Sequence, residues 1–395
     1  MKPRFEVADV IGLHADAFRQ KYQLTGQVLR TLKAIEQCRT PALGGHVDLC
    51  DACSHLRISY NSCRNRHCPK CQTVNREKWI AAREADLLPI AYFHLIFTLP
   101  DTLNPLCLQQ PKVLYNILFR SSWETVLDFA KDPKHLGAKP GMVAILHTWG
   151  QNISLHPHIH CIFPGGGITA QGKWKESRNK GKFLFPVKAM SKVFRAKFVS
   201  KLRQWAKEEK QDITRQLFDE LFKKAWVVYA KQPFGGPKQV VEYLGRYTHK
   251  VAISNHRLLH VGKQGITFTW KDYRHGNSKK QMQLSGQEFL RRFCQHILPY
   301  GFMRIRHYGI LSSRCKTEKL QQARSDLKTE APPKPDLNWK VIALQRLNYN
   351  PDQCPHCKKG QMITVLHFDG CHGPPNKHLL QKLKKRTMKP KEKAT

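Results

Sequence analysis

The chain has 395 residues, in which 67 lysines and arginines outnumber 29 aspartates and glutamates, for a net charge of +38. This length predicts two or three domains with a buried core, and the basic excess indicates a polyanionic partner, with nucleic acid first. No apolar run reaches the roughly 18 residues that a membrane span needs, and no signal peptide opens the chain, so we expect neither a membrane protein nor a secreted one.

The chain begins with a segment that we predict to be helical as far as about residue 37. Val28, Leu32 and Ile35 recur at helical spacing, and Thr25 suits the cap of that helix. This segment leads directly into the most cysteine-rich part of the chain.

Most candidate metal ligands lie between residues 38 and 71. Because we expect a reducing compartment, the chain's 13 cysteines favour metal binding over disulfides. Two Cys-x-x-Cys knuckles separated by fourteen residues predict one tetrahedral zinc site, formed by Cys50, Cys53, Cys68 and Cys71. The other candidates would complete a second site or exchange partners with the first, and these are Cys38, His46, Cys63 and His67. One or two zinc ions are therefore expected.

Two arginines stand between the knuckles. Arg64 and Arg66 lie on a loop that a metal would brace, and arginines there suit contacts with phosphates or base edges. We therefore predict that they bind DNA or RNA; the alternative is an ordinary solvated loop.

The stretch from Pro140 to Gly172 holds 33 residues without an Asp, Glu, Lys or Arg, in a chain that is 24% charged. We predict a β-hairpin, with a strand over 142–149, a turn over 151–157 and three glycines at 165–167 ending the second strand. Side chains alternate along a strand, so His158 and His160 share one face, while the other face carries Ile159, Cys161 and Phe163.

Two neighbouring imidazoles on a rigid, apolar-backed strand suit a divalent metal ion. The alternative is a pair of hydrogen-bonded core histidines.

Further elements are predicted on both sides of the hairpin. They are helices over 74–89, 111–130, 188–224 and 286–298, and strands over 91–99, 226–229, 257–261, 266–273 and 303–311. This mixed order favours an α+β fold.

A helix that begins at Pro237 carries two tyrosines four residues apart, Tyr243 and Tyr247, with Arg246 and Lys250 beside them. Taken alone, such a pair is more often packing than chemistry. Beside a histidine metal site, however, a phenolate is a competent nucleophile on phosphorus, and a cation such as Lys250 could steady the developing charge. Arg246 is a candidate DNA contact.

The C-terminal part follows a linker over 331–335. Cys354 and Cys357 form a third knuckle, and the residues available to complete a zinc site there are His367, Cys371 and His372. The last twenty residues hold seven lysines and one arginine against one glutamate, which predicts a flexible basic tail.

These motifs together resemble a known family. A His-hydrophobic-His strand and a helix with two tyrosines resemble the two-tyrosine branch of the HUH endonucleases, and the closer similarity is to bacterial rolling-circle transposases of the insertion-sequence ninety-one family. CRTPALGGH, CDAC and YNSCRNRHCPKCQ resemble the zinc-binding domain of that family. Four further segments resemble the catalytic region of that family and follow one another in the same order: YFHLIFTLP, LHTWGQNISLHPHIHCIFPGGG, YLGRYTHKVAISNHRL and GFMRIRHYGILSS.

The resemblance implies that His158 and His160 bind Mg²⁺ or Mn²⁺ and that Tyr243 and Tyr247 are nucleophiles. It also implies a third polar metal ligand, which stays open between Gln151, His147 and His156. One tyrosine would attack single-stranded DNA at an element end, leaving a 5′-phosphotyrosine and a free 3′-hydroxyl, and rejoining would need no ATP. The implied fold is α+β, with a central antiparallel sheet flanked by helices and a small zinc-binding domain. The implied location is the bacterial cytoplasm, in association with the nucleoid.

We predict three domains from these patterns. Residues 1–88 would form the helical, zinc-binding and DNA-binding domain, 89–324 the catalytic domain, and 325–395 a linker with the third knuckle and the basic tail. The oligomeric state stays open.

Other functions fit part of the sequence. A histidine-triad nucleotide hydrolase would use the three histidines at 156, 158 and 160, but Pro157, the cysteines and the charge argue against it. A zinc-finger regulator without catalysis would explain the cysteines and leave the histidine hairpin unexplained. A plasmid replication initiator or relaxase would share the chemistry, and the zinc segment favours the transposase.

Overall fold

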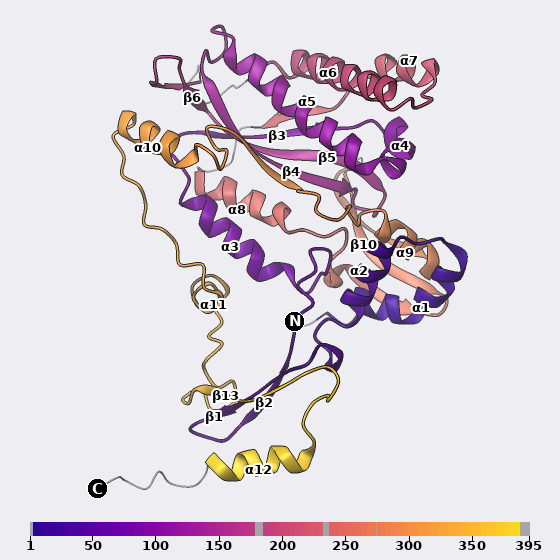
Figure 1. Cartoon of the computed structure of the whole chain (residues 1–395), viewed down its shortest axis with the longest axis vertical. Coiled ribbons are helices and arrows are strands. Elements are labelled where there is room, and N and C mark those ends of the chain that lie inside the picture. Colours follow the sequence, from indigo (N-terminus) through magenta and orange to yellow (C-terminus); the bar gives the residue numbers. More distant parts are fainter. Residues whose placement is uncertain (1–2, 178–184, 232–236, 274, 388–395) are drawn as a thin grey trace.

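The computed structural model describes residues 3–177, 185–231, 237–273 and 275–387, and its centre is a seven-stranded antiparallel sheet (Figure 1). The strands follow the order β7-β6-β4-β5-β3-β8, with β12 paired to β4. Their bounds are β3 (Tyr92–Thr98), β4 (Lys139–Trp149), β5 (Leu155–Pro164), β6 (Gly166–Ile168), β7 (Trp174–Glu176), β8 (Val228–Lys231) and β12 (Ile305–Gly309). The predicted hairpin is confirmed as β4 and β5, which lie in the middle of the sheet.

One face of this sheet carries the main apolar core. The odd-numbered residues of β5, from Ile159 to Phe163, are buried there with the aromatic side chains of Phe97 and Phe194. Figure 1 shows this face covered by α5 and α6. The helices on this side are α4 (Asn104–Gln109), α5 (Pro111–Lys131), α6 (Val187–Glu208) and α7 (Arg215–Lys223).

The opposite face is covered by α3 (Gln72–Glu84), α8 (Pro237–Thr248) and α10 (Lys316–Asp326). A smaller apolar cluster there joins Val143 and Ile162 of the sheet to Val240 of α8 and Leu320 of α10. The sheet is thus enclosed by helices on both sides, and the predicted α+β fold is confirmed.

The N-terminal helices α1 (Val7–Lys21) and α2 (Gly26–Glu36) pack on a second sheet from the middle of the chain. The Thr25 side chain accepts a hydrogen bond from the Val28 amide, as predicted for a cap. The second sheet and its helix are β9 (Leu258–Gly262), β10 (Gly265–Asp272), β11 (Ser278–Leu284) and α9 (Gly286–Cys294). These contacts cross the boundary predicted at residue 88.

A third sheet joins the two ends of the chain, in the order β13-β1-β2. Its strands are β1 (Gly45–Cys50), β2 (Leu56–Tyr60) and β13 (Met362–Phe368). The C-terminal helices are α11 (Trp339–Leu347) and α12 (Lys377–Thr387). The pairing of β13 with β1 crosses both predicted boundaries, and α12 occupies part of the segment predicted as a flexible tail; residues 388–395 lie outside the described part.

Short 3-10 turns occur at Pro41–Leu43, Asp101–Leu103 and Asn255–Arg257. Among the described residues, no helix has both the length and the apolar character needed to cross a bilayer.

Candidate functional site

The histidine site consists of three imidazoles on the central hairpin. His158 and His160 lie on the face of β5 opposite Ile159 and Cys161, as predicted, and His147 of β4 pairs directly with His158 across the two strands. One ligand nitrogen from each of the three rings lies within 4.8 Å of the others. The site faces the layer formed by α3 and α8.

Hydrogen bonds fix the orientation of two of these rings. The Nδ1 of His158 lies 2.7 Å from the carbonyl oxygen of His156, so this nitrogen donates and the Nε2 lone pair is left for another partner. The two Nε2 atoms of His158 and His160 are 3.1 Å apart. On the other side of its ring, His160 Nδ1 lies 2.9 Å from His94 Nε2. The 3.1 Å between the Nε2 atoms of His158 and His160 suits an ion shared by these two nitrogens, about 2.1 Å from each of them.

Burial keeps these imidazoles neutral. Desolvation, with a smaller contribution from His156, lowers the pKa of His158 to about 3. Desolvation together with the neighbouring His147 also lowers the pKa of His160 well below its usual value. Neutral imidazoles are the form that binds metal, so the donor set fits a divalent ion.

Of the three candidates for a third ligand, the structure brings only His147 to the pair. Its ring is 3% exposed and its centroid lies 4.6 Å from that of His160. Gln151 lies in the turn, where its side-chain amide donates to the Tyr273 hydroxyl. His156 is exposed and contributes its carbonyl oxygen to His158. His94 was missed as a partner of the site; its position in a predicted buried strand was the available signal.

Helix α8, which carries Tyr243 and Tyr247, packs against both α3 and strand β5. The side chains of Tyr243, Tyr247 and Arg246 lie outside the described part of the chain. The helix itself is held closely, because a Cβ at Gly245 would lie 2.2 Å from Cγ1 of Ile80 on α3. The helix predicted to carry the nucleophiles is therefore anchored on the sheet face that holds the histidine site.

Lys250 follows α8 and is exposed. Desolvation by the surrounding residues lowers the pKa of its ammonium, and the charges of Arg257 and Lys271 lower it further. Its charge is also among those that lower the pKa of His160, after burial and the neighbouring histidines.

A cleft of about 940 Å³ runs between the cysteine-rich loops, the start of α3 and the end of the hairpin. Its cationic lining residues are Arg39, Lys70, Arg76, Lys250 and Arg257, and among the described residues Glu6 is the one carboxylate that lines it. Trp149 also lines the cleft and stacks on His147, with ring centroids 4.6 Å apart. The basic cleft therefore leads to the histidine site through Trp149.

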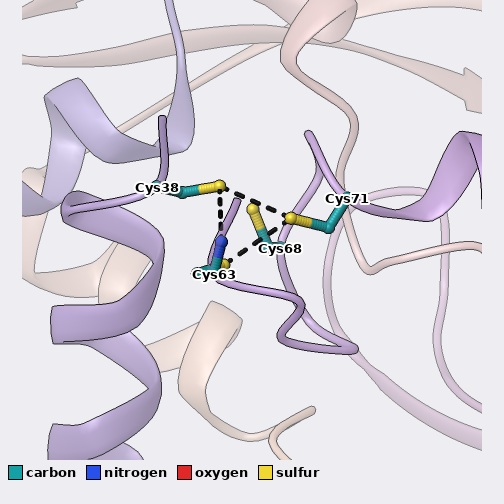
Figure 2. A group of neighbouring side chains, drawn as sticks. All are labelled: Cys38, Cys63, Cys68 and Cys71. Atoms are coloured by element: carbon teal, nitrogen blue, oxygen red, sulfur yellow. Dashed lines mark hydrogen bonds between the residues drawn. The ribbon is translucent and has the colours of Figure 1, made fainter. Parts of the chain in front are cut away.

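The N-terminal cysteine cluster consists of Cys38, Cys63, Cys68 and Cys71 (Figure 2). The Cys71 sulfur lies 3.4 Å from that of Cys38 and 3.7 Å from that of Cys63. Sulfurs at the corners of a tetrahedral zinc site lie about 3.8 Å apart, so this cluster fits one ion. Hydrogen bonds among the four sulfurs lower the pKa of Cys38 and Cys71 and raise that of Cys63 and Cys68, as expected of thiols that share protons.

The joint cysteine cluster consists of Cys50, Cys53, Cys354 and Cys357. The sulfurs of Cys50 and Cys357 are 3.7 Å apart, as are those of Cys53 and Cys354. Backbone amides of Gly360 and Lys359 lower the pKa of Cys357 to about 6. The first knuckle thus meets the third one, from the far end of the chain.

The predicted four-cysteine zinc set requires correction. The structure separates Cys50 and Cys53 from Cys68 and Cys71, because the β1–β13 pairing brings a different knuckle to the first pair. His46 faces Asp48 at 3.5 Å and belongs to neither cluster. His67 is buried beside the N-terminal cluster without being part of it.

The C-terminal candidates also separate. His367 lies opposite His46 in the β1–β13 register, while His372 bonds Asp369 and Cys371 is exposed. Cys354 and Cys357 therefore find their partners at the N-terminal end and not in the segment that follows them.

The two arginines of the N-terminal loop have different environments. The Arg66 guanidinium donates to the carbonyls of Leu298, Pro299 and Phe302, so it braces the loop against the core rather than facing a nucleic acid. This corrects the prediction for Arg66. Arg64 is exposed and remains a candidate contact.

Comparison with known proteins agrees with this arrangement. The family model described as "Putative transposase" matches residues 141–319, and the one described as "Transposase zinc-binding domain" matches residues 10–99. The chain is 44% identical to the "Putative transposase y4qJ" of Sinorhizobium fredii (strain NBRC 101917 / NGR234), over 94% of this chain and 97% of that one. It is 28% identical to the transposase for insertion sequence element IS801 of Pseudomonas savastanoi pv. phaseolicola, over 85% and 83%. No solved structure matches.

The matched segments contain the histidine site, helix α8 and the N-terminal cysteine cluster, and these define a transposase with DNA as its partner. The chain belongs to the insertion-sequence ninety-one family of transposases, with the N-terminal zinc-binding domain of that family.

Proposed function

We propose that this transposase cleaves and rejoins single-stranded DNA through 5′-phosphotyrosine intermediates, as rolling-circle transposition requires. The observation that carries the proposal is the convergence of His147, His158 and His160 on the sheet face that α8 covers. Tyr243 and Tyr247 lie on that helix three and seven residues after the buried Val240, which belongs to the apolar cluster on the same face. Helical spacing puts these three positions on one stripe.

The three imidazoles would hold the catalytic ion. Mg²⁺ prefers oxygen ligands and Mn²⁺ accepts imidazole more readily, so an all-histidine set favours Mn²⁺ of the two. Such an ion would polarise the scissile phosphate and reduce the charge that the attacking phenolate meets. His94, behind His160, would orient its ring, as outer hydrogen-bond partners of metal ligands do.

The chemistry itself would fall to the tyrosines. The hydroxyl oxygen of Tyr243 or Tyr247 forms a bond to phosphorus, the bond to the 3′ oxygen breaks, and the tyrosine proton is finally carried by the 3′-hydroxyl. Lys250 would stabilise the charge on the phosphoryl oxygens. Because the phosphotyrosine keeps the energy of the phosphodiester, a 3′-hydroxyl can reverse the step without a nucleotide cofactor.

The basic cleft is the proposed path of the DNA strand. Its cations suit phosphates, and Trp149 offers a ring on which a base of an unpaired strand can stack. Since Trp149 also stacks on His147, a base held there would lie next to the catalytic ion.

The test is a search for covalent protein–DNA adducts on denaturing gels. Labelled single strands that include the element's own ends are incubated with protein and Mn²⁺ or Mg²⁺, beside duplexes of the same sequence. We expect adducts with single strands only, and their loss in His158→Ala and in the Tyr243→Phe, Tyr247→Phe double variant. Tyr300→Phe is the matched control, because Tyr300 is 88% exposed and remote in sequence from α8.

The variants separate the alternatives. Metal-dependent cleavage that persists in the Tyr243→Phe, Tyr247→Phe double variant would make the protein an ordinary metal-dependent nuclease. Tight binding without cleavage across the whole pool would favour a zinc-finger regulator.

A further inference from the structure

The joint cysteine cluster lies outside the proposed catalytic machinery, and its two halves come from opposite ends of the chain. Cys53 and Cys354 are 301 residues apart in sequence, yet their sulfurs are 3.7 Å apart. Residues 10–99, which match the zinc-binding domain, contain only the first half. We propose that a second zinc ion binds Cys50, Cys53, Cys354 and Cys357, and that it fastens the C-terminal segment to the N-terminal zinc-binding domain.

The two halves are built alike. In each, the residue after the second cysteine has a left-handed backbone, with φ of 55° at Ser54 and 61° at Lys358. In each, the amide of that residue donates to the carbonyl of the first cysteine, at 3.1 Å. This is the turn that directs two sulfurs of a Cys-x-x-Cys knuckle toward one point. Two such turns facing each other present four sulfurs to a single ion.

Backbone amides also point at the sulfurs. The Cys53 amide lies 3.4 Å from the Cys50 sulfur, and the Gly360 amide lies 3.3 Å from the Cys357 sulfur. Amide hydrogen bonds stabilise thiolate over thiol, and thiolate is the form that binds zinc.

The two knuckles lie so close together that a residue with a side chain would not fit at position 360. A Cβ added at Gly360 would lie 2.5 Å from the Cys50 sulfur, so this glycine permits the close approach of the two knuckles. The Asp51 amide donates to the Gln361 carbonyl, and the Gln361 amide donates to the Asp51 carboxylate. These bonds hold the knuckles in register, so the site is preorganised for its ion.

The ion would act together with two other fastenings of the same segment. Strand β13 pairs along the whole length of β1. On α11, Arg346 forms ion pairs with Glu77 and Glu84 of α3, at 3.0 and 2.9 Å. Because α3 in turn packs on α8, the C-terminal segment would support the layer above the histidine site.

The test is the zinc content of the purified full chain, measured by mass spectrometry. All variants carry His158→Ala, so that the histidine site does not contribute zinc. We expect two zinc ions per chain in this background and one after Cys354→Ser with Cys357→Ser. Cys371→Ser is the matched control and should keep two, because this exposed cysteine belongs to neither cluster.

A chain that holds one zinc with all cysteines present would overturn the proposal, as would two ions that persist without Cys354 and Cys357. Loss of a zinc ion in Cys371→Ser would make Cys371 a zinc ligand, and this would overturn the proposed set of four cysteines as well. Zinc X-ray absorption on the unmutated clusters does not depend on how a cysteine variant folds. It should show four sulfurs at about 2.3 Å and no nitrogen in the first shell; a nitrogen contribution would reject the four-sulfur site.

Discussion

Gly245 is the point at which helix α8 meets α3, and its replacement by alanine tests that packing. An added Cβ would lie 2.2 Å from Cγ1 and 2.4 Å from Cδ1 of Ile80, a side chain that is 4% exposed. Carbon atoms in contact prefer about 3.5–4.0 Å, so the two helices must move apart or Ile80 must leave its rotamer. Such overpacking costs about 1–3 kcal/mol.

The higher helix propensity of alanine opposes this packing cost and raises the free energy of unfolding. Alanine in a helix is more favourable than glycine by about 1 kcal/mol. Gly12 supplies the matched control, because it is an exposed position in α1 where a Cβ meets only a Glu36 oxygen at 3.8 Å. Gly12→Ala should therefore stabilise the protein by about 1 kcal/mol. The unfolding free energies of Gly245→Ala and Gly12→Ala should differ by about 1–3 kcal/mol, which is the packing cost alone.

The assay is urea unfolding at a fixed excess of zinc, followed by circular dichroism and fluorescence together. Ile80→Ala removes both atoms that the new Cβ would strike. In that background Gly245→Ala should become stabilising, so the sign of its effect reverses. If Gly245→Ala stabilised the protein as much as Gly12→Ala, with Ile80 present, the inferred contact between α3 and α8 would be refuted.

Four further outcomes are expected. His147→Asn should weaken Mn²⁺ binding about 10-fold or more, measured by paramagnetic resonance titration, and an unchanged Kd would remove His147 from the ligand set. Burial lowers the pKa of His296 from 6.5 to about 4, so the unfolded state binds its proton first and the free energy of unfolding falls as pH drops from 6.5 to 4. That loss is at most about 1.4 kcal/mol per pH unit, and urea midpoints of His296→Gln should show a shallower dependence. Arg66→Ala should destabilise the protein by about 1–3 kcal/mol, because it leaves partly buried carbonyls without donors. Arg64→Ala should instead leave stability unchanged and reduce the salt dependence of DNA binding, and equal effects of the two changes would contradict their assigned environments.

The elements of the central sheet were predictable because their signals are local. Alternation along β5 assigns His158 and Ile159 to opposite faces whatever the strand pairs with, and the charge-free hairpin identifies the centre of the sheet. Strand β11 was missed because its sequence, SKKQMQL, is that of a polar edge strand with little apolar signal.

Partners far apart in sequence could not be predicted in the same way. Each Cys-x-x-Cys knuckle forms by itself, but its spacing contains nothing about which other knuckle it will face. The pairing of Cys50 with Cys357 follows from the β1–β13 register, which joins residues more than 300 positions apart. Likewise, the sequence around Arg66 is typical of an exposed cation, because its hydrogen-bond acceptors, the carbonyls of Pro299 and Phe302, lie more than 230 residues away in the chain.

The union of the chain's two ends has a consequence for biosynthesis. Strand β1 is the middle strand of its sheet, and its second neighbour, β13, follows it by more than 300 residues in the chain. At about 5–20 residues per second, a ribosome needs roughly 15–60 s to reach β13 after completing β1. Throughout that time Val47 and Leu49, which are buried in the finished sheet, belong to an open edge. A nascent or prematurely terminated transposase that lacks β13 would therefore remain recognisable to chaperones and proteases as unfinished, because this sheet is complete only after β13 has been made.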